Sequence, residues 1–217
     1  MRRVLPALAL ALVSLGTAPA QAREVGGCRV PGSATVHAVG GRLVVWSVRR
    51  LDRWDDYETR VVACRRSSGT RVVVSETLES YDFAEVPYAV TVAGDYVAYA
   101  ESHSGRSFGL NVNVFDARRR EYVREEVVAW HPTLGGELAR IESLVASRSG
   151  AVAFAIRHRL DRDHADRPRE RLGIRALDRD GRRLLDKGEG IDPASLRIAA
   201  GEVRWTNAGE PRSAPLR

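Results

Sequence analysis

The chain contains almost no lysine. Lys187 is its one lysine, so its 34 basic residues are nearly all arginine, and 28 acidic residues are interleaved with them along the whole length. A nucleic-acid-binding protein would gather such positive charge into one face or tail, and no run of the sequence does so. We therefore expect no nucleic-acid partner, and the excess of arginine over lysine indicates a GC-rich coding sequence.

Long hydrophobic runs are also missing, with one exception at the amino terminus. Arg2 and Arg3 precede an apolar run over residues 4–15, and small residues then lead to Ala20-Gln21-Ala22. This is the order of a secretory signal peptide, and a run of about a dozen residues is too short to cross a bilayer as a helix. We predict a cleaved signal peptide at 1–22 and a secreted, envelope or periplasmic mature chain without a transmembrane helix.

Two other export routes use the same segment. A twin-arginine signal would fit Arg2-Arg3 followed by Leu5, and a lipoprotein would use Cys28 as its anchor. The second route places Arg23 and Glu24 inside the signal, between the apolar run and the cysteine. Ordinary Sec export is therefore the favoured route.

Cysteine is scarce as well. Cys28 and Cys64 are the two cysteines, and both lie in the exported part of the chain. An even pair in an oxidising compartment predicts one disulfide, with two buried thiols as the alternative. Such a bond would tie the amino-terminal segment to the first repeat and stabilise the fold by roughly 4 kcal/mol on the chain-entropy model.

Helical periodicity is absent beyond the signal, and a repeated strand pattern takes its place. Four segments each combine an apolar strand, a glycine turn and a second apolar strand with an aromatic residue. Glycine suits these turns because hairpins need positive φ angles, and the recurring aromatic residues are predicted to form the core between repeats. The turn glycines are Gly41, Gly94, Gly150 and Gly201, and the aromatic residues are Trp46, Tyr99, Phe154 and Trp205.

Each repeat continues with further alternating strands, so the predicted fold is all-β. We expect one domain over 23–217, built from four propeller-like repeats of about fifty residues as a small or incomplete β-propeller. The last repeat is one strand short, and segment 23–30 is predicted to pair with it and close the ring. The repeats cover approximately 33–80, 86–130, 141–189 and 194–217.

The four strand–glycine–strand–aromatic units resemble the PD40 or TolB-like class of β-propeller repeats found in exported bacterial proteins. The resemblance extends over residues 33–217, nearly all of the mature chain. It implies an architecture only, because this class includes binding proteins, scaffolds and some enzymes.

Motifs for catalysis and metal binding are missing too. The histidines do not occur at metal-ligand spacing, and no Gly-x-Ser-x-Gly elbow or phosphate-binding glycine loop is present. Residues 161–166 contain three aspartates but lack the glycine of a calcium loop, so they are predicted to be a solvated loop. The sequence predicts no catalytic residue, no metal site and no cofactor.

Three long polar segments are the best candidates for binding. They lie within 49–57, 101–108 and 161–166, each between the second and third strands of a repeat, so a radial arrangement would place them on one face. Aromatic residues with arginines nearby are enriched at contact sites. The predicted partner-binding residues are Trp54, Tyr57, His103, Phe108 and His164.

The leading functional hypothesis is an exported, non-enzymatic binding or scaffold module that acts as a monomer. Its partner would be an unknown protein or an extracellular polymer, bound by loops on one rim. The alternative is an extracellular hydrolase or lyase that acts on a polymer through a site assembled across repeats. A purely structural envelope protein is a third hypothesis.

Overall fold

The computed structural model consists of β-structure throughout its described part. The residues described are 21–51, 56–79, 84–104, 108–131, 139–159 and 170–217. Within these ranges there is no helix that is long and apolar enough to cross a membrane. Trp54 and His164, two of the predicted binding residues, lie outside the described residues, as does most of the predicted signal peptide.

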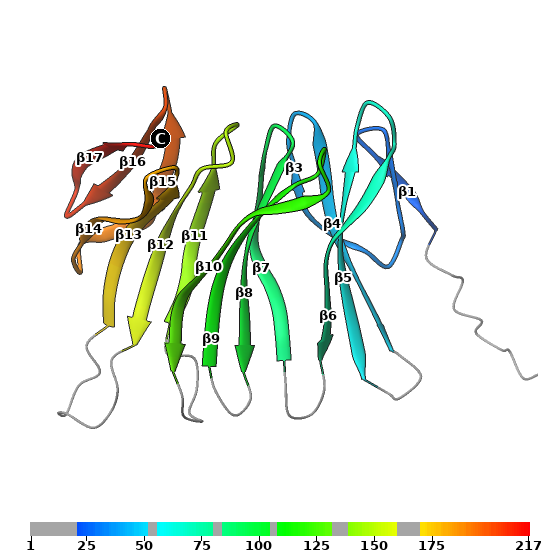
Figure 1. Ribbon diagram of the computed structural model, residues 1–217, viewed down its shortest axis with the longest axis horizontal. Helices are drawn as coiled ribbons and strands as arrows, with labels where there is room; N and C mark the ends of the chain where they lie inside the picture. Colours follow the sequence, from blue (N-terminus) through cyan, green and yellow to red (C-terminus); the bar gives the residue numbers. More distant parts are fainter. Residues whose placement is uncertain (1–20, 52–55, 80–83, 105–107, 132–138, 160–169) are drawn as a thin grey trace, which may run out of the picture.

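The strands from residue 35 onward form four antiparallel sheets, called blades 1–4 below, which stand side by side in chain order (Figure 1). Blade 1 contains β3 (Thr35–Val39), β4 (Leu43–Leu51), β5 (Tyr57–Arg65) and β6 (Arg71–Glu79). Blade 2 contains β7 (Ala84–Ala93), β8 (Tyr96–Ser104), β9 (Phe108–Asp116) and β10 (Glu121–His131). Blade 3 contains β11 (Ala139–Ala146), β12 (Val152–Arg159), β13 (Glu170–Asp178) and β14 (Gly181–Lys187). Blade 4 has three strands, β15 (Ile191–Ala199), β16 (Glu202–Asn207) and β17 (Glu210–Pro215).

The second strand of each of the first three blades is buried on both faces. Residues 43–46 of β4, 97–100 of β8 and 152–156 of β12 are all buried and form continuous hydrophobic runs. One side of each strand packs on the preceding element and the other side on the following one, as in strands covered on both faces. The aromatic residues of the repeats fill these layers as predicted, with relative exposures of 1% or less for Trp46, Tyr99 and Phe154 and 4% for Trp205.

The blades form an open row. The first strands of successive blades contact one another, β3 with β7, β7 with β11, and β11 with β15. No sheet of the described residues combines strands from the two ends of the chain, and β1 and β17 lie at opposite ends of the row (Figure 1). The prediction that segment 23–30 completes the last blade is therefore wrong, whereas the incomplete β-propeller is confirmed.

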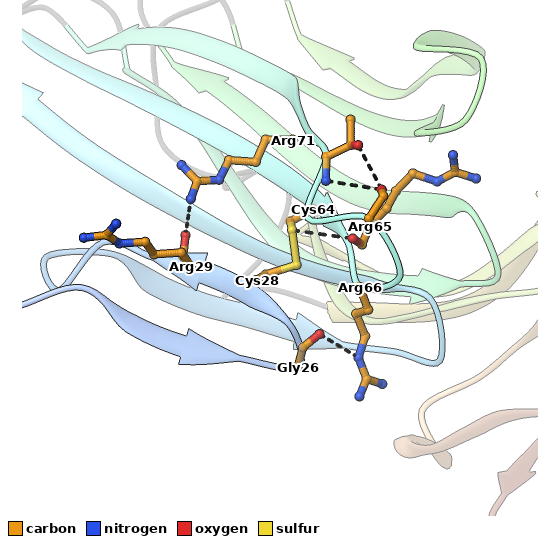
Figure 2. The surroundings of a disulfide bond; sticks show 9 residues. Gly26, Cys28, Arg29, Cys64, Arg65, Arg66 and Arg71 are labelled. Carbon is orange, nitrogen blue, oxygen red and sulfur yellow. Dashed lines mark hydrogen bonds between the residues drawn. A yellow bond between two sulfur atoms is a disulfide. The ribbon is translucent and has the colours of Figure 1, made fainter.

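The amino-terminal segment instead forms a hairpin of its own, β1 (Arg23–Val25) with β2 (Cys28–Val30), which covers the outer face of blade 1. The predicted disulfide between Cys28 and Cys64 joins this hairpin to β5, with the two Cα atoms 6.1 Å apart (Figure 2). The side chains of Val30, Val44 and Trp46 pack around it in one apolar cluster. The hairpin therefore supplies the neighbour that blade 1 lacks, as a terminal cap does in a repeat protein.

Arginine side chains reinforce this cap. The Arg66 side chain donates through Nε to the Gly26 carbonyl at 3.1 Å, and Arg71 donates to the Arg29 carbonyl at 2.7 Å (Figure 2). Both bonds join blade 1 to the hairpin on either side of the disulfide. The cap is thus held by a covalent bond, an apolar cluster and two charge-assisted hydrogen bonds.

At the opposite end of the row, the outer face of blade 4 carries polar side chains. In β16, buried Val203 and Trp205 face blade 3, while Glu202, Arg204 and Thr206 alternate with them and face outward. The outermost strand, β17, contains Pro211 and Pro215, which have no N–H group to offer to another strand. Such prolines hinder pairing of an exposed edge with a second chain.

Blade 4 is fixed to blade 3 by two buried or half-buried carboxylates. Asp186 accepts hydrogen bonds from Trp205 Nε1 at 2.7 Å and Asn207 Nδ2 at 3.0 Å. Burial alone would raise the pKa of Asp186, but these hydrogen bonds outweigh it and lower the pKa below its ordinary value. Asp178 behaves in the same way, because hydrogen bonds from the Arg183 side chain and the Arg217 backbone N–H outweigh burial and lower its pKa.

Three of the four repeat glycines adopt the predicted turn conformation. Gly94, Gly150 and Gly201 have φ angles of 63°, 80° and 79°. Gly41 has no positive φ, so the prediction of a left-handed turn residue is wrong at that position. A Cβ atom added at Gly41 would meet nothing within 4 Å, because this turn opens onto a hollow in the surface.

Candidate functional site

The predicted rim lies at the edge of the blades opposite the glycine turns. The strands that flank the three long segments end or begin at this edge, at Leu51 and Tyr57 in blade 1 and at Ser104 and Phe108 in blade 2. The Tyr57 ring is 39% exposed, and the Arg49 guanidinium carbon lies 3.7 Å from its centroid. This pair retains the features expected of a contact site.

The other described residues of the predicted rim differ from this pair. The His103 side chain is half-buried and lies across Gly109, where an added Cβ would approach its ring to 1.8 Å. Phe108 is 5% exposed and belongs to the apolar core between blades 2 and 3. Phe108 therefore has almost no surface to offer a partner. Its position in the sequence could not show whether it lies in a loop or is the first residue of a buried strand.

A hollow lies on the opposite edge, among the glycine turns. It has a volume of about 1280 Å³ and is called the turn-face pocket below. Its lining comes from all four blades: Gly41 and Arg42 from blade 1, residues 92–96 from blade 2, residues 146–149 from blade 3, and Ile198 and Gly201 from blade 4. The β9–β10 turn and Leu216 complete it.

Charged side chains of the turn-face pocket carry a positive excess. Its lining includes four arginines, Arg42, Arg118, Arg119 and Arg148, and two aspartates, Asp95 and Asp116. Two of the arginines are paired with these aspartates. Arg42 lies 2.9 Å from Asp95, and Arg119 lies 3.7 Å from Asp116 and 3.6 Å from Glu121.

Both aspartates already serve the fold. Asp95 also faces Arg65, whose Nη2 lies 3.4 Å from it, and Asp116 accepts hydrogen bonds from the backbone N–H groups of Arg118 and Arg119 at 2.8 and 3.1 Å. Such bonds shape the tight β9–β10 turn. Both carboxylates are therefore engaged in holding neighbouring turns together.

Arg118 and Arg148 are in a different position. Both are exposed lining residues, and their guanidinium groups form no ion pair with any residue of the described part of the chain. The Arg148 side chain passes over Gly94, where a Cβ would lie 3.7 Å from it. These two groups are the pocket's unpaired positive charges.

The wall between these charges is partly apolar. Val92, Ala146, Ile198 and Leu216 line the pocket and are half-buried. Val92, Ala146 and Ile198 lie near the ends of β7, β11 and β15, the first strands of blades 2, 3 and 4, and Leu216 lies at the carboxyl terminus. The pocket thus combines a basic rim with an apolar surface, a composition suited to a ligand with both kinds of group.

A catalytic constellation is not found among the described residues. The lining of the turn-face pocket contains no histidine or cysteine, and no group of three or more histidine, cysteine or acidic residues in the described ranges could hold a metal ion. Burial lowers the pKa of His37 and of His158, so burial favours the neutral form of both rings. His37 is hydrogen-bonded to Ser47 at 2.8 Å, in blade 1 and outside the pocket.

Blades 1 and 2 share a buried polar cluster below the apolar part of their interface. Glu101 is 8% exposed and accepts hydrogen bonds from Ser75 at 3.3 Å and Asn113 at 3.2 Å. Burial, and next the hydrogen bond with Tyr122, raise the pKa of Tyr99. These groups are mutually satisfied within the interface, so we assign them to the alignment of the two blades.

The sequence predicts a binding surface on the loop rim, whereas the turn-face pocket lies at the opposite edge of the blades. The glycines that revealed the repeats also mark the turn face, and Arg42 and Arg148 lie within two positions of Gly41 and Gly150. Arginine beside a repeated turn glycine was a usable signal, because turns at equivalent places of successive blades lie on one face. It was outweighed by loop length, which measures tolerance of insertion as well as function.

Comparison with solved structures finds a distant match. It is the β-propeller domain of the Trilobed protease from Pyrococcus furiosus, described as having an open velcro topology, with a TM-score of 0.30 and 10% sequence identity. The match covers 85% of this chain and 65% of that one, so this chain spans less than two thirds of that structure. No protein-family model and no curated protein sequence matches the chain. The architecture assigned above rests on the four sheets themselves.

Proposed function

We propose that this protein is an exported, non-enzymatic binding module that receives its partner in the turn-face pocket. The observation that carries the proposal is the convergence of all four blades on one hollow of about 1280 Å³. Concave sites with an apolar surface and a few polar groups are where proteins usually bind ligands. Every blade of the array contributes residues to this site.

Export follows from the amino-terminal sequence. The basic start, short apolar run and Ala20-Gln21-Ala22 favour a signal peptide that is removed after Ala22. The Cys28–Cys64 bond is in keeping with an oxidising compartment. We place the mature chain in the periplasm, the envelope or the medium, as a PD40 or TolB-like repeat protein.

The alternative, a polymer-active hydrolase or lyase, requires a carboxylate or histidine free to move a proton. In the turn-face pocket the acidic residues Asp95 and Asp116 are held in ion pairs and backbone hydrogen bonds. The charge excess there is positive, which suits recognition of an acidic ligand. Binding is therefore the function that this geometry supports best.

A second candidate surface is the loop rim predicted from the sequence. One observation favours it, the exposed Tyr57 ring with the Arg49 guanidinium stacked on it. The two surfaces lie at opposite edges of the blades, so variants can test them separately.

The test uses one variant for each surface and a matched control. Gly41→Trp adds an indole ring at the blade 1 edge of the turn-face pocket, where no atom lies within 4 Å of the added Cβ and the φ angle is not positive. Tyr57→Ala removes the rim aromatic residue, and Ser213→Trp adds an equal ring on exposed β17, away from the pocket.

Each immobilised protein is incubated with the envelope and secreted fractions of the producing cells, and the retained components are compared. We expect the wild type, Tyr57→Ala and Ser213→Trp to retain a partner that Gly41→Trp loses. Retention by Gly41→Trp together with loss by Tyr57→Ala would transfer the site to the rim and contradict the proposal.

A further inference from the structure

We infer that the turn-face pocket binds an acidic peptide segment of a partner protein, an inference that rests on the proposed function and specifies its ligand. The charge of the pocket favours an acidic ligand. The lining contains four arginines and two aspartates, so the charged side chains of the pocket leave an excess of two positive charges. A concave surface focuses such a field toward its centre and favours a ligand of opposite sign.

The four arginines of the pocket differ in their ion pairs. Arg42 and Arg119 are neutralised by Asp95 and Asp116, and these pairs hold the turns in place. Arg118 and Arg148, from blades 2 and 3, form no ion pair in the described part of the chain. A guanidinium group binds a carboxylate through two parallel hydrogen bonds, so each of these arginines can take one acidic side chain.

The size and polarity of the pocket favour a peptide. A volume of about 1280 Å³ far exceeds one carboxylate and accommodates several residues of an extended chain. The apolar lining, formed by Val92, Ile198 and Leu216 among others, needs apolar groups from the ligand. A peptide that alternates acidic and apolar side chains supplies both kinds of contact.

The composition of the lining argues against an acidic polysaccharide. Sugar rings bind proteins largely by stacking on aromatic side chains. Tyr96 is the one aromatic residue of the described lining, and its ring already packs against Gly150, where an added Cβ would lie 3.0 Å from it. A peptide is therefore the better match to this surface.

The experiment measures binding of a fluorescein-labelled peptide of nine alternating glutamate and leucine residues by fluorescence anisotropy. The mature protein, Arg118→Ala/Arg148→Ala and Arg23→Ala/Arg171→Ala are compared. The last variant removes two exposed charges that lie outside the pocket. A peptide with lysine in place of glutamate and unlabelled polygalacturonate serve as a charge control and a competitor.

We expect saturable binding of the acidic peptide, a roughly five- to tenfold loss of affinity in Arg118→Ala/Arg148→Ala, as for two exposed ion pairs, and no change in the control variant. The lysine peptide should not bind. Equal loss in both double variants, the absence of saturable binding, or stronger binding of polygalacturonate than of the peptide would each overturn the inference.

Gly41→Trp in the retention assay separates this inference from the proposed function. If it loses the natural partner while Arg118→Ala/Arg148→Ala keeps it, the pocket is a binding site but its ligand is not acidic. If it keeps the natural partner, the pocket is not the site and both statements fail.

Discussion

Removal of the disulfide with Cys28→Ala and Cys64→Ala should detach the cap from blade 1. The two cysteines are 36 residues apart in sequence. The chain-entropy relation for a loop of this length gives a loss of about 3.8 kcal/mol in the free energy of unfolding. Because the hairpin is the only described cover on the outer side of blade 1, Trp46, now 1% exposed, would also meet water whenever the hairpin separates.

Two measurements check this prediction. Urea denaturation followed by tryptophan fluorescence gives the loss in free energy, and a thermal melt should show a midpoint lower by roughly 8–15 °C for a domain of this size. Limited trypsin digestion should cut the variant after Arg29 much faster than the wild type, because this exposed residue lies in the hairpin. A loss below about 1 kcal/mol, or unchanged cleavage after Arg29, would refute the view that the disulfide holds the cap.

Three further predictions concern single positions. Gly190→Ala should lower the free energy of unfolding by about 1–3 kcal/mol, because the added Cβ would lie 2.8 Å from the backbone nitrogen of Ala208, whereas Gly41→Ala, which meets nothing, should be neutral in the same urea titration. Asp186→Ala leaves the indole N–H of Trp205 without its partner and should cost about 2 kcal/mol, measured by the same method; an unchanged midpoint would contradict this role. The pKa values of Asp178 and Asp186 are lowered in the folded state, so both ionised carboxylates stabilise the fold fully above the ordinary carboxyl pKa of about 3.9. This stabilisation is lost as the pH falls through their folded-state pKa values. Melting temperatures measured between about pH 5 and 2 should therefore fall less in Asp186→Ala than in the wild type.

Much of the fold could be predicted because local chemistry repeats along the chain. Turn glycines and strand aromatic residues located the second strand of every blade, and the cysteine pair located the bond between the first segment and the first blade. The strand pattern also indicates where the array of blades ends. Residues 97–100 and 152–156 are continuously apolar, whereas Glu202–Asn207 alternates, as expected of a strand with only one covered face.

The relation between the two chain ends could not be predicted in the same way. A missing fourth strand in the last blade invited the first segment to supply it, but the row of blades does not bring β1 to β17. The outer face of blade 1 is strongly apolar, with Val44, Trp46 and Val48, and the hairpin buries it. Burial of that apolar face therefore stabilises the hairpin on blade 1, and the edge of β17 stays without a fourth strand.

The candidate site escaped prediction for a related reason. Arg42, Arg118 and Arg148 are distant in sequence and meet only because successive turns lie at the same edge of the row. The basic residues are interleaved with acidic ones along the sequence, so no cluster of positive charge could be predicted from it. Three-dimensional repetition created a local excess that a linear chain does not display.

The open row has a consequence for cooperativity. In a closed ring every blade packs between two neighbours, whereas in this row the extensive contacts of the described strands run between successive blades, so we expect the two ends to loosen independently. A ligand in the turn-face pocket would touch Arg42 at one end and Ile198 at the other at the same time. It would couple the two ends energetically, so that a protein able to melt from its ends when empty would melt as one unit when occupied.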